Sequence, residues 1–344
     1  MTRGLGNEGN AVVIDEFAVA PPSSRKVALA LIAVLLCAML FLYYGPNDSY
    51  DIVSITALIA IPAAIGGLIT QAVDPFGRLS PMGCFAWPTI FLLALTGFAY
   101  VVLNEGAVCI AMVLPIWIPA AVLGGLVQYL NARRRRFVEG QVSTLNAYSW
   151  CALPMLLIAW DQSSPAQWTD TKVVRSLEID AAVEKVWPHI ASIRNISTSE
   201  GLSTFTHDVV GIPRPSQALL VQETNRVVRK AQWGSSARFE EVVQSVVPGQ
   251  EMKWAFSFPD KSIQHHTDRH ISPVGPYLRI VSGGYQLVPI SKDRTRLILT
   301  TSYRMKVWMV AYFGWWGEQI LGDIQNNVLA IVKGRVANSA RLEK

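Results

Sequence analysis

The sequence predicts a chain in two halves. An α-helical membrane region of about five transmembrane helices precedes an α+β domain, in which an antiparallel sheet wraps a long C-terminal helix. Charged residues are scarce up to residue 160, where only 8 of the 30 Lys and Arg residues and 8 of the 25 Asp and Glu residues lie. Long apolar runs fill that part, whereas short β-branched runs broken by turn signals fill the remainder.

Five apolar segments approach the ~20 residues that cross a bilayer. They are residues 27–44, 52–73, 85–103, 107–130 and 142–160, and the last is the weakest because Ser143, Thr144 and Asn146 dilute its start. We therefore expect a disordered cytoplasmic tail at 1–24, a transmembrane helical domain at 25–160, a linker at 161–170 and the α+β domain at 171–340.

Basic residues indicate how these segments are oriented. Arg25 and Lys26 precede the first segment, Arg78 lies between the second and third, and a run of four arginines (133–136) lies between the fourth and fifth. The other two loops contain no Lys or Arg. This alternation predicts a multi-pass protein of the inner (plasma) membrane, with a cytoplasmic N-terminus and an extracytoplasmic C-terminal domain.

One internal repeat lies in the apolar half. The run "IPAAIGGLITQ" (61–71) recurs as "IPAAVLGGLVQ" (118–128) with one residue inserted, which suggests a duplicated helical hairpin in parallel orientation. Paired glycines let another helix approach closely, so contact with a membrane protein partner or a homo-oligomer stays open. No charged residue stands mid-span, which disfavours a pump or a channel.

The second half alternates between strand and helix patterns. Runs typical of strands are 172–179, 226–233, 237–247, 252–258, 279–288 and 294–305, and their short gaps favour antiparallel pairing. A helix is expected after the first strand, with Asp180 as its N-cap. A long helix at about 307–337 carries an apolar stripe of Trp316, Ile320, Ile324, Val328 and Ile331.

This order of elements is that of a helix-grip fold. The pieces "RSLEIDAAVEKVWPHIA", "FEEVVQSVVPGQEMKWAF", "GGYQLVPISKDRTRLILTTSY" and "ILGDIQNNVLAIVKGR" resemble the polyketide cyclase/dehydrase-like branch of the SRPBCC (START-like) superfamily. The resemblance covers about residues 171–335 and leaves the N-terminal multi-pass region unexplained. It implies a hydrophobic ligand held between the sheet and the C-terminal helix, with no universal catalytic motif to transfer.

Strand alternation selects the residues expected to line that cavity. Met252 and Phe258 share the inward face of one strand, and Val281 shares that of another. The predicted ligand-binding residues are Arg229, Trp233, Phe239, Glu241, Trp254, Phe256, His265, Tyr285, Leu299, Thr301, Tyr303, Trp308, Tyr312 and Trp316. For any single aromatic residue, simple core filling is the alternative.

Two of these residues are charged, and a buried charge is costly unless it is paired. Arg229 and Glu241 are therefore expected to pair, or else to orient a carboxylate, hydroxyl or carbonyl of the ligand. Tyr303 is a candidate general acid in a cyclase, or a phenol hydrogen-bonded to a ligand or neighbour.

The stretch "IQHHTDRHISP" (263–273) holds three of the five histidines. On a strand, His265 would share the inward face, whereas His266, Asp268 and His270 would line the outer face. Because no fourth ligand is evident, we expect neither a metal site nor a cofactor there, but a solvated, pH-responsive strand face or a bulge that turns His270 into the pocket. The four cysteines match neither a zinc pattern nor a disulfide framework.

These observations favour binding over catalysis. The leading hypothesis is a membrane-anchored binding protein for a lipid or other hydrophobic small molecule. The alternatives are a cyclase/dehydratase-type enzyme acting on an aromatic or polyketide-like substrate, and a membrane sensor or assembly factor that binds a protein partner. A formal net charge of +5 is too small and too dispersed to predict nucleic-acid binding.

Overall fold

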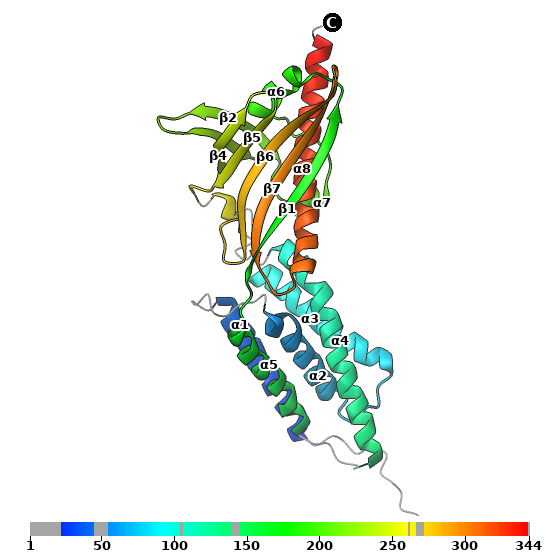
Figure 1. Ribbon diagram of the computed structural model, residues 1–344. Coiled ribbons are helices and arrows are strands. Elements are labelled where there is room, and N and C mark those ends of the chain that lie inside the picture. The colour runs from blue at the N-terminus through cyan, green and yellow to red at the C-terminus, as the bar shows by residue number, and fades with distance from the viewer. Residues whose placement is uncertain are drawn as a thin grey trace, which may run out of the picture.

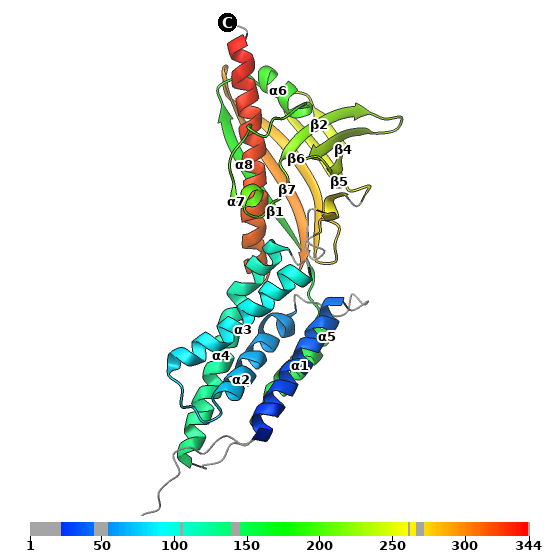
Figure 2. The same ribbon diagram turned by 180° about the vertical axis from the view of Figure 1, so that it is seen from behind.

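The computed structural model describes residues 22–44, 54–103, 106–138, 145–260, 262–265 and 272–342. A bundle of helices forms one end of the molecule, and a curved sheet with a long helix forms the other (Figure 1). The final helix begins beside the bundle and runs away from it to the C-terminus, as the reverse view also shows (Figure 2).

The helical half comprises α1 (Pro22–Tyr44), the π-helix η1 (Thr56–Ala60), α2 (Ile61–Val73), α3 (Pro81–Val102), α4 (Ala107–Val138) and α5 (Leu145–Ser163). Of the helices described, three are long and apolar enough to cross a membrane: Thr56–Val73, Pro81–Val102 and Ala107–Arg135. The expectation of five spans is therefore corrected to three candidates. Ser149, Asp161 and Gln162 make α5 more polar, and the side chains of α1 are described only over residues 25–40.

The two repeated sequences lie on α2 and α4, which pack against each other. A Cβ atom built on Gly66 would overlap the backbone carbonyl of Ala121, and one built on Gly124 would overlap that of Ala63. Each added Cβ atom would therefore meet the partner helix about one turn before the equivalent glycine of that helix, because Cα–Cβ bonds tilt toward the N-terminus. This reciprocal contact is a parallel packing of two small-residue faces, which brings the two backbones close together.

The second half contains an antiparallel sheet that, in the described residues, has the strand order β1-β7-β6-β5-β4-β3-β2. Its strands are β1 (Trp168–Ile179), β2 (Pro215–Gln222), β3 (Val227–Trp233), β4 (Ala237–Val247), β5 (Glu251–Ser257), β6 (Leu278–Ser291) and β7 (Arg294–Lys306). The first strand pairs with the last, so β1 and β7 lie together beside the long helix α8 (Val310–Leu342). An antiparallel sheet wrapped on a C-terminal helix is the expected helix-grip arrangement.

A compact core closes the end of the sheet that lies away from the helical half (Figure 1). Val186 and Ile190 of the short helix α6 (Val183–Ala191) pack there against Leu297 of β7 and Leu329 of α8. Burying such side chains contributes roughly 1.5–3 kcal/mol each. The tight packing is therefore concentrated at one end, and the space between sheet and helix lies toward the other.

Three local expectations are corrected by the structure. The N-cap of α6 is Ala182 and not Asp180, whose side chain is 84% exposed. The strand β2 was not anticipated from the sequence, because the run "PSQALLVQ" starts with Pro and lacks regular alternation. Ser262–His265 form a short 3-10 helix, η2, where a strand had been considered.

The glycine contact between α2 and α4 can be tested with two single substitutions. We expect Gly66→Ala to lower the free energy of unfolding by about 1–3 kcal/mol, because the added methyl group forces two backbones apart. Gly97→Ala in α3 is the matched control: no neighbouring atom lies within 4 Å of its Cβ position, and Ala is a better helix former than Gly. The measurement is thermal and denaturant unfolding in detergent, followed by tryptophan fluorescence; equal shifts in the two variants would contradict this packing.

Candidate functional site

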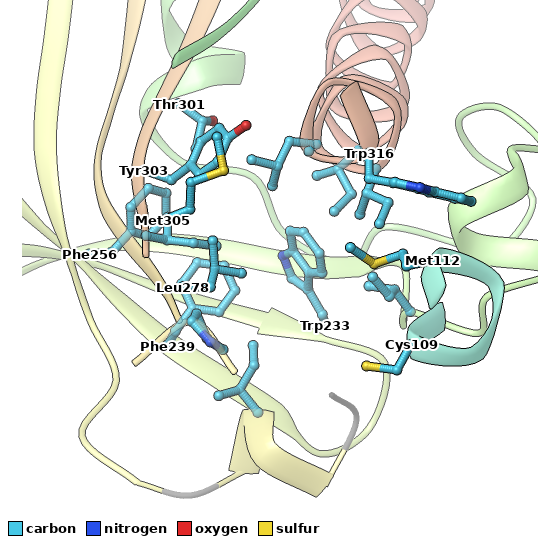
Figure 3. Close-up of a pocket in the computed structure, with 18 of the residues that line it drawn as sticks. Cys109, Met112, Trp233, Phe239, Phe256, Leu278, Thr301, Tyr303, Met305 and Trp316 are labelled. Atoms are coloured by element: carbon cyan, nitrogen blue, oxygen red, sulfur yellow. The ribbon is translucent and has the colours of Figure 1, made fainter. Parts of the chain in front are cut away.

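A cavity of about 510 Å³ lies between the sheet and α8 and continues toward the helical half (Figure 3). This volume falls within the range of about 300–1,000 Å³ that is usual for small-molecule sites. The apolar stripe of α8 faces it, since Trp316, Ile320, Ile324, Val328 and Ile331 all line the cavity. The sheet supplies the opposite wall.

The structure places the fourteen sequence-predicted residues as follows. Eleven line the cavity: Arg229, Trp233, Phe239, Glu241, Trp254, Phe256, Tyr285, Leu299, Thr301, Tyr303 and Trp316. Their contact with a ligand stays a prediction. Trp308 and Tyr312 lie outside the lining, because Trp308 precedes the start of α8 and the Tyr312 hydroxyl donates a hydrogen bond to the carbonyl oxygen of Met112, 2.6 Å away in α4.

The histidine-rich stretch lies almost wholly outside the described residues. The backbone of His265 ends η2, and its side chain is not described. His266, Asp268 and His270 fall in the undescribed segment 266–271. In the described part of the chain, no group of three His, Cys, Asp or Glu side chains could hold a metal ion.

Period-two alternation in the sequence correctly predicts which side chains of β7 point inward, but it predicts those of β6 only in part. Every second residue of β7 from Thr295 to Met305 is buried, as period-two alternation requires. In β6, the register shifts between Ile280 and Ser282, so Ile280 lines the cavity while Val281 is 42% exposed. The expectation that Val281 points inward is therefore wrong, and the β-bulge is the reason.

An aromatic cluster forms the part of the wall built by β3, β4 and β5. The ring of Phe239 lies 5.5 Å from Trp233, 5.9 Å from Phe256 and 6.0 Å from Phe258, measured between centroids. Aromatic pairs at such separations add roughly 0.5–1.5 kcal/mol beyond area burial. The cluster therefore gives the cavity a stiff apolar wall.

Glycine 283 allows Trp254 to lie across the neighbouring strand. The two residues are paired in register on β5 and β6, and a Cβ atom at Gly283 would collide with the Trp254 indole. The absence of a side chain at Gly283 thus permits this close approach, near the bulge between Ile280 and Ser282.

Arg229 and Glu241 form a buried ion pair on the cavity wall. The Nη1–Oε2 distance is 2.5 Å, and the two side chains are only 6% and 9% exposed. The guanidinium carbon also lies 5.7 Å from the ring of Trp254 and 5.4 Å from that of Tyr285. The expected pairing is therefore present, and two aromatic faces support the cation.

Burial raises the pKa of Glu241 above its ordinary value, while the charge of Arg229 opposes that rise. The carboxylate is held by the guanidinium at short distance, so the pair presents a dipole with no net charge to the cavity. A carboxylate engaged in this way is a poor general base, because accepting a proton would leave the buried arginine without its counter-ion.

Gln325 of α8 and Tyr303 of β7 add further polar groups to the cavity lining. Gln325 donates through Nε2 to Thr301 Oγ1 at 2.9 Å and to the carbonyl oxygen of Val173 at 3.1 Å. Within the described residues, neither Tyr303 Oη nor Gln325 Oε1 has a hydrogen-bond partner, and the same holds for Trp254 Nε1. A buried polar atom without a partner costs about 1–3 kcal/mol, so a ligand that bonds to these atoms would recover that energy.

Burial raises the pKa of the Tyr303 phenol, and the negative charge of Glu318 raises it further. The hydroxyl is therefore protonated at neutral pH. As a result, Tyr303 can donate a hydrogen bond to an oxygen atom of a ligand, whereas it cannot act as a phenolate base.

His189 and His207, which stand apart from the histidine-rich stretch, both contact α8. Nδ1 of His207 lies 2.8 Å from the Ile212 carbonyl, and its Nε2 lies 3.2 Å from the Asn327 amide nitrogen. His189 Nε2 lies 3.3 Å from Ser339 Oγ. His207 thus has a packing role, while His189 also reaches the cavity lining.

Sequence reasoning missed the part of the lining that comes from the helical half. Leu36 and Met39 of α1, Leu95 of α3, and Cys109 and Met112 of α4 all border the cavity. They belong to apolar runs that the sequence assigns to bilayer contact, so no local signal distinguishes them. Figure 3 shows Cys109 and Met112 opposite the sheet, on the helix that closes this side.

No protein-family model matches the chain, and no curated protein matches it. Among solved structures, an aromatase/cyclase from Streptomyces sp. R1128 is 11% identical; the match covers 50% of this chain and 96% of that one, with a TM-score of 0.32. A START superfamily protein from Mycobacterium smegmatis is 12% identical over 49% of this chain and 98% of its own, with a TM-score of 0.32. Norcoclaurine synthase from Thalictrum flavum is 13% identical over 48% and 86%, with a TM-score of 0.30.

At these TM-scores, the fold assignment rests on the strand order and on the position of α8. The aromatase/cyclase and the synthase are enzymes according to their names, and those activities belong to those proteins. The described cavity of this chain is defined by its own lining residues.

The buried ion pair can be tested by breaking and then replacing it. We expect Glu241→Leu to lower the free energy of unfolding by about 3–5 kcal/mol, because it leaves Arg229 buried and uncompensated. The double variant Arg229→Met, Glu241→Leu should recover most of that loss, since an apolar pair of similar volume fits the site. Asp170→Asn, which removes an exposed ion pair to Arg304, should change stability little. Urea unfolding in detergent measures all three, and a double variant no more stable than Glu241→Leu would contradict this explanation.

Proposed function

We propose that this protein is a membrane-anchored binding protein for a lipid or other hydrophobic small molecule, which is held between the sheet and α8. The observation that carries the proposal is the cavity of about 510 Å³, bordered mainly by aromatic and aliphatic side chains with few polar groups. Pockets of this composition are typical of sites for apolar ligands.

The helical half supports the membrane part of the proposal. Of the candidate span Pro81–Val102, only 17% is buried within the protein, so most of α3 presents apolar side chains outward. Exposed apolar surface of that extent is usual where a protein contacts lipid or another protein. The described residues offer two further candidate spans beside it.

The positions of the basic residues support an orientation with the sheet domain outside the cytoplasm. The loop after α2 reaches the far end of α4, where the Cβ position of Gly77 lies 3.0 Å from the backbone nitrogen of Arg133. Arg78 is the next residue, and Arg25 lies near the start of α1. In Figure 1 that end of the bundle is the one remote from the sheet, as an excess of Lys and Arg on the cytoplasmic side requires.

A cyclase- or dehydratase-type reaction is the second candidate. The Tyr303 phenol favours it, because Tyr303 lines the cavity and its hydroxyl, a proton donor, lacks a partner among the described residues. Glu241, which would be the natural second group, is engaged by Arg229. Binding is therefore the function that the geometry supports best.

Ligand binding is tested by isolating the full chain from a membrane-containing host and identifying bound molecules by native mass spectrometry. We expect a hydrophobic small molecule to copurify with the wild-type chain and to be lost from Ala231→Trp, since Ala231 lines the cavity and is 5% exposed. The matched control is Val246→Trp, at a position of β4 that is 42% exposed. A wild-type chain that carries no such molecule, even after incubation with total lipid extract, would refute the proposal.

The orientation is tested by fusing a reporter enzyme that is active only outside the cytoplasm to the C-terminus. We expect activity in this fusion and none in a fusion after Gly77, at the opposite end of the bundle. The reverse pattern would show that the sheet domain is cytoplasmic.

A further inference from the structure

The cavity does not end at the sheet domain. One continuous space is bordered by Met305 and Phe313 of the sheet domain and by Met112, Val113 and Trp117 of α4. The first turns of α4 are thus a wall of the binding cavity as well as a part of the helical bundle (Figure 3). The two halves share this space, and the hydrogen bond from the Tyr312 hydroxyl to Met112 keeps them together at its edge.

Two lining residues also reach the outer surface of the helical half. Leu40 of α1 is 45% exposed and Phe98 of α3 is 54% exposed, yet both border the cavity. The neighbouring Met39 packs against Leu92 and Trp117, which shows that this part of α1 lies beside α3 and α4. The cavity therefore reaches an apolar outer surface near α1 and α3, a surface that contacts acyl chains if the protein has the proposed function.

Polarity changes along the cavity. Next to the helical half, the lining includes Met305, Val307 and Leu278, which pack together in one apolar cluster. Further along the same face of β7 come Tyr303 and Thr301, at steps of about 6.7 Å. Tyr303 Oη, Gln325 Oε1 and Trp254 Nε1, which have no partner among the described residues, thus lie on the far side of this passage, whereas the indole nitrogens of Trp117 and Trp316 lie beside it.

The charges on the cavity wall determine which kind of polar group of a ligand can bind beside Tyr303 and Gln325. Arg229 is already neutralised by Glu241, so the wall carries no unpaired charge for an anionic or cationic headgroup. The lining atoms at this end that lack a partner among the described residues are three donors, Tyr303 Oη, Trp254 Nε1 and Arg229 Nε, and one acceptor, Gln325 Oε1. A hydroxyl, ester or amide group can bond to both kinds, whereas a phosphate would be buried without a counter-ion.

We propose that the cavity is loaded from the bilayer, through the opening near Leu40 and Phe98 and past Met112, by an amphiphile with an uncharged oxygen-bearing end and an apolar chain. This inference rests on the proposed function and specifies the route and ligand class of the same site. The polar end lies at Tyr303 and Gln325, and the chain extends back along Met305 toward the helical half. The flexible thioethers of Met112 and Met305 can adapt to the passing chain.

The route is tested by photocrosslinking in proteoliposomes that contain the full chain and a long-chain alcohol bearing a diazirine on the chain. After irradiation, peptide mass spectrometry locates the adducts. We expect adducts on the first turns of α4 and on β7 and α8 in the wild-type protein. In Met112→Trp, which narrows the passage, the β7 and α8 adducts should fall to the level of the unirradiated sample.

The control variant is Val101→Trp, in which an equally large side chain replaces a residue that is 73% exposed and outside the cavity lining; it should label like the wild type. Labelling of β7 and α8 that persists in Met112→Trp overturns the route and leaves the proposed function standing. If Met112→Trp does not fold, the positions of the adducts in the wild-type protein test the route. Adducts on the sheet domain with none on α4 would also overturn it. If no probe labels the sheet domain of the wild type, the proposed function itself fails.

The ligand class is tested with a second probe that carries the same chain and a phosphocholine headgroup. We expect the alcohol to label β7 and α8 at least about tenfold more strongly, because each unsatisfied or unpaired buried polar group costs a factor of this order. Equal labelling by the two probes would overturn the assignment of an uncharged end.

Discussion

One buried glutamine ties α8 to the edge of the sheet by hydrogen bonds. Gln325 donates to Thr301 on β7 and to the Val173 carbonyl on β1, so the helix is tied to the two strands at one edge of the sheet. A buried amide that lost these partners would carry an unsatisfied donor. Because the helix is held over β1 and β7, the strands from β6 to β3 curve past it, and the space that they enclose is the cavity.

The same attachment explains why the cavity has one closed and one open end. Beyond Gln325, α8 packs with α6 and the sheet through Leu329 and Val336, and the cavity narrows to the lining residues Val328, Ile331 and Val332. Before Gln325, its face carries Trp316 and Ile320, which stand back from the sheet and border the cavity. The helix therefore divides the domain into a packed end that provides stability and an open end that receives the helical half.

The sequence predicted the features that follow from short-range periodicity. Alternation along β7 and the stripe on α8 identified most of the cavity wall on the sheet-domain side, since period-two and helical repeats are local properties. The bulge at Ile280 could not be foreseen, because a single extra residue changes the inward set without altering the composition of the strand. Val281 was misplaced for that reason. Trp308 and Tyr312 were included on the assumption that the helix began earlier and covered the sheet with its first turn.

The contribution of the helical half to the cavity was beyond sequence reasoning for another reason. Apolar side chains such as Met39, Leu95 and Met112 satisfy equally well a contact with lipid, with another helix or with a ligand. Only the tertiary arrangement distinguishes these environments. The buried ion pair was predictable, because the energetic cost of isolated charges leaves Arg229 and Glu241 few alternatives when both point inward.

The hydrogen bond that connects the two halves affects how the sequence of such a protein can evolve. Tyr312 bonds to the main-chain oxygen at position 112, and every amino acid supplies that oxygen. The side chain at 112, which borders the cavity, can therefore be exchanged while the joint that holds the halves together remains. Under the proposed function, substitutions at position 112 can therefore alter the width of the cavity while the connection between the two parts of the molecule is preserved.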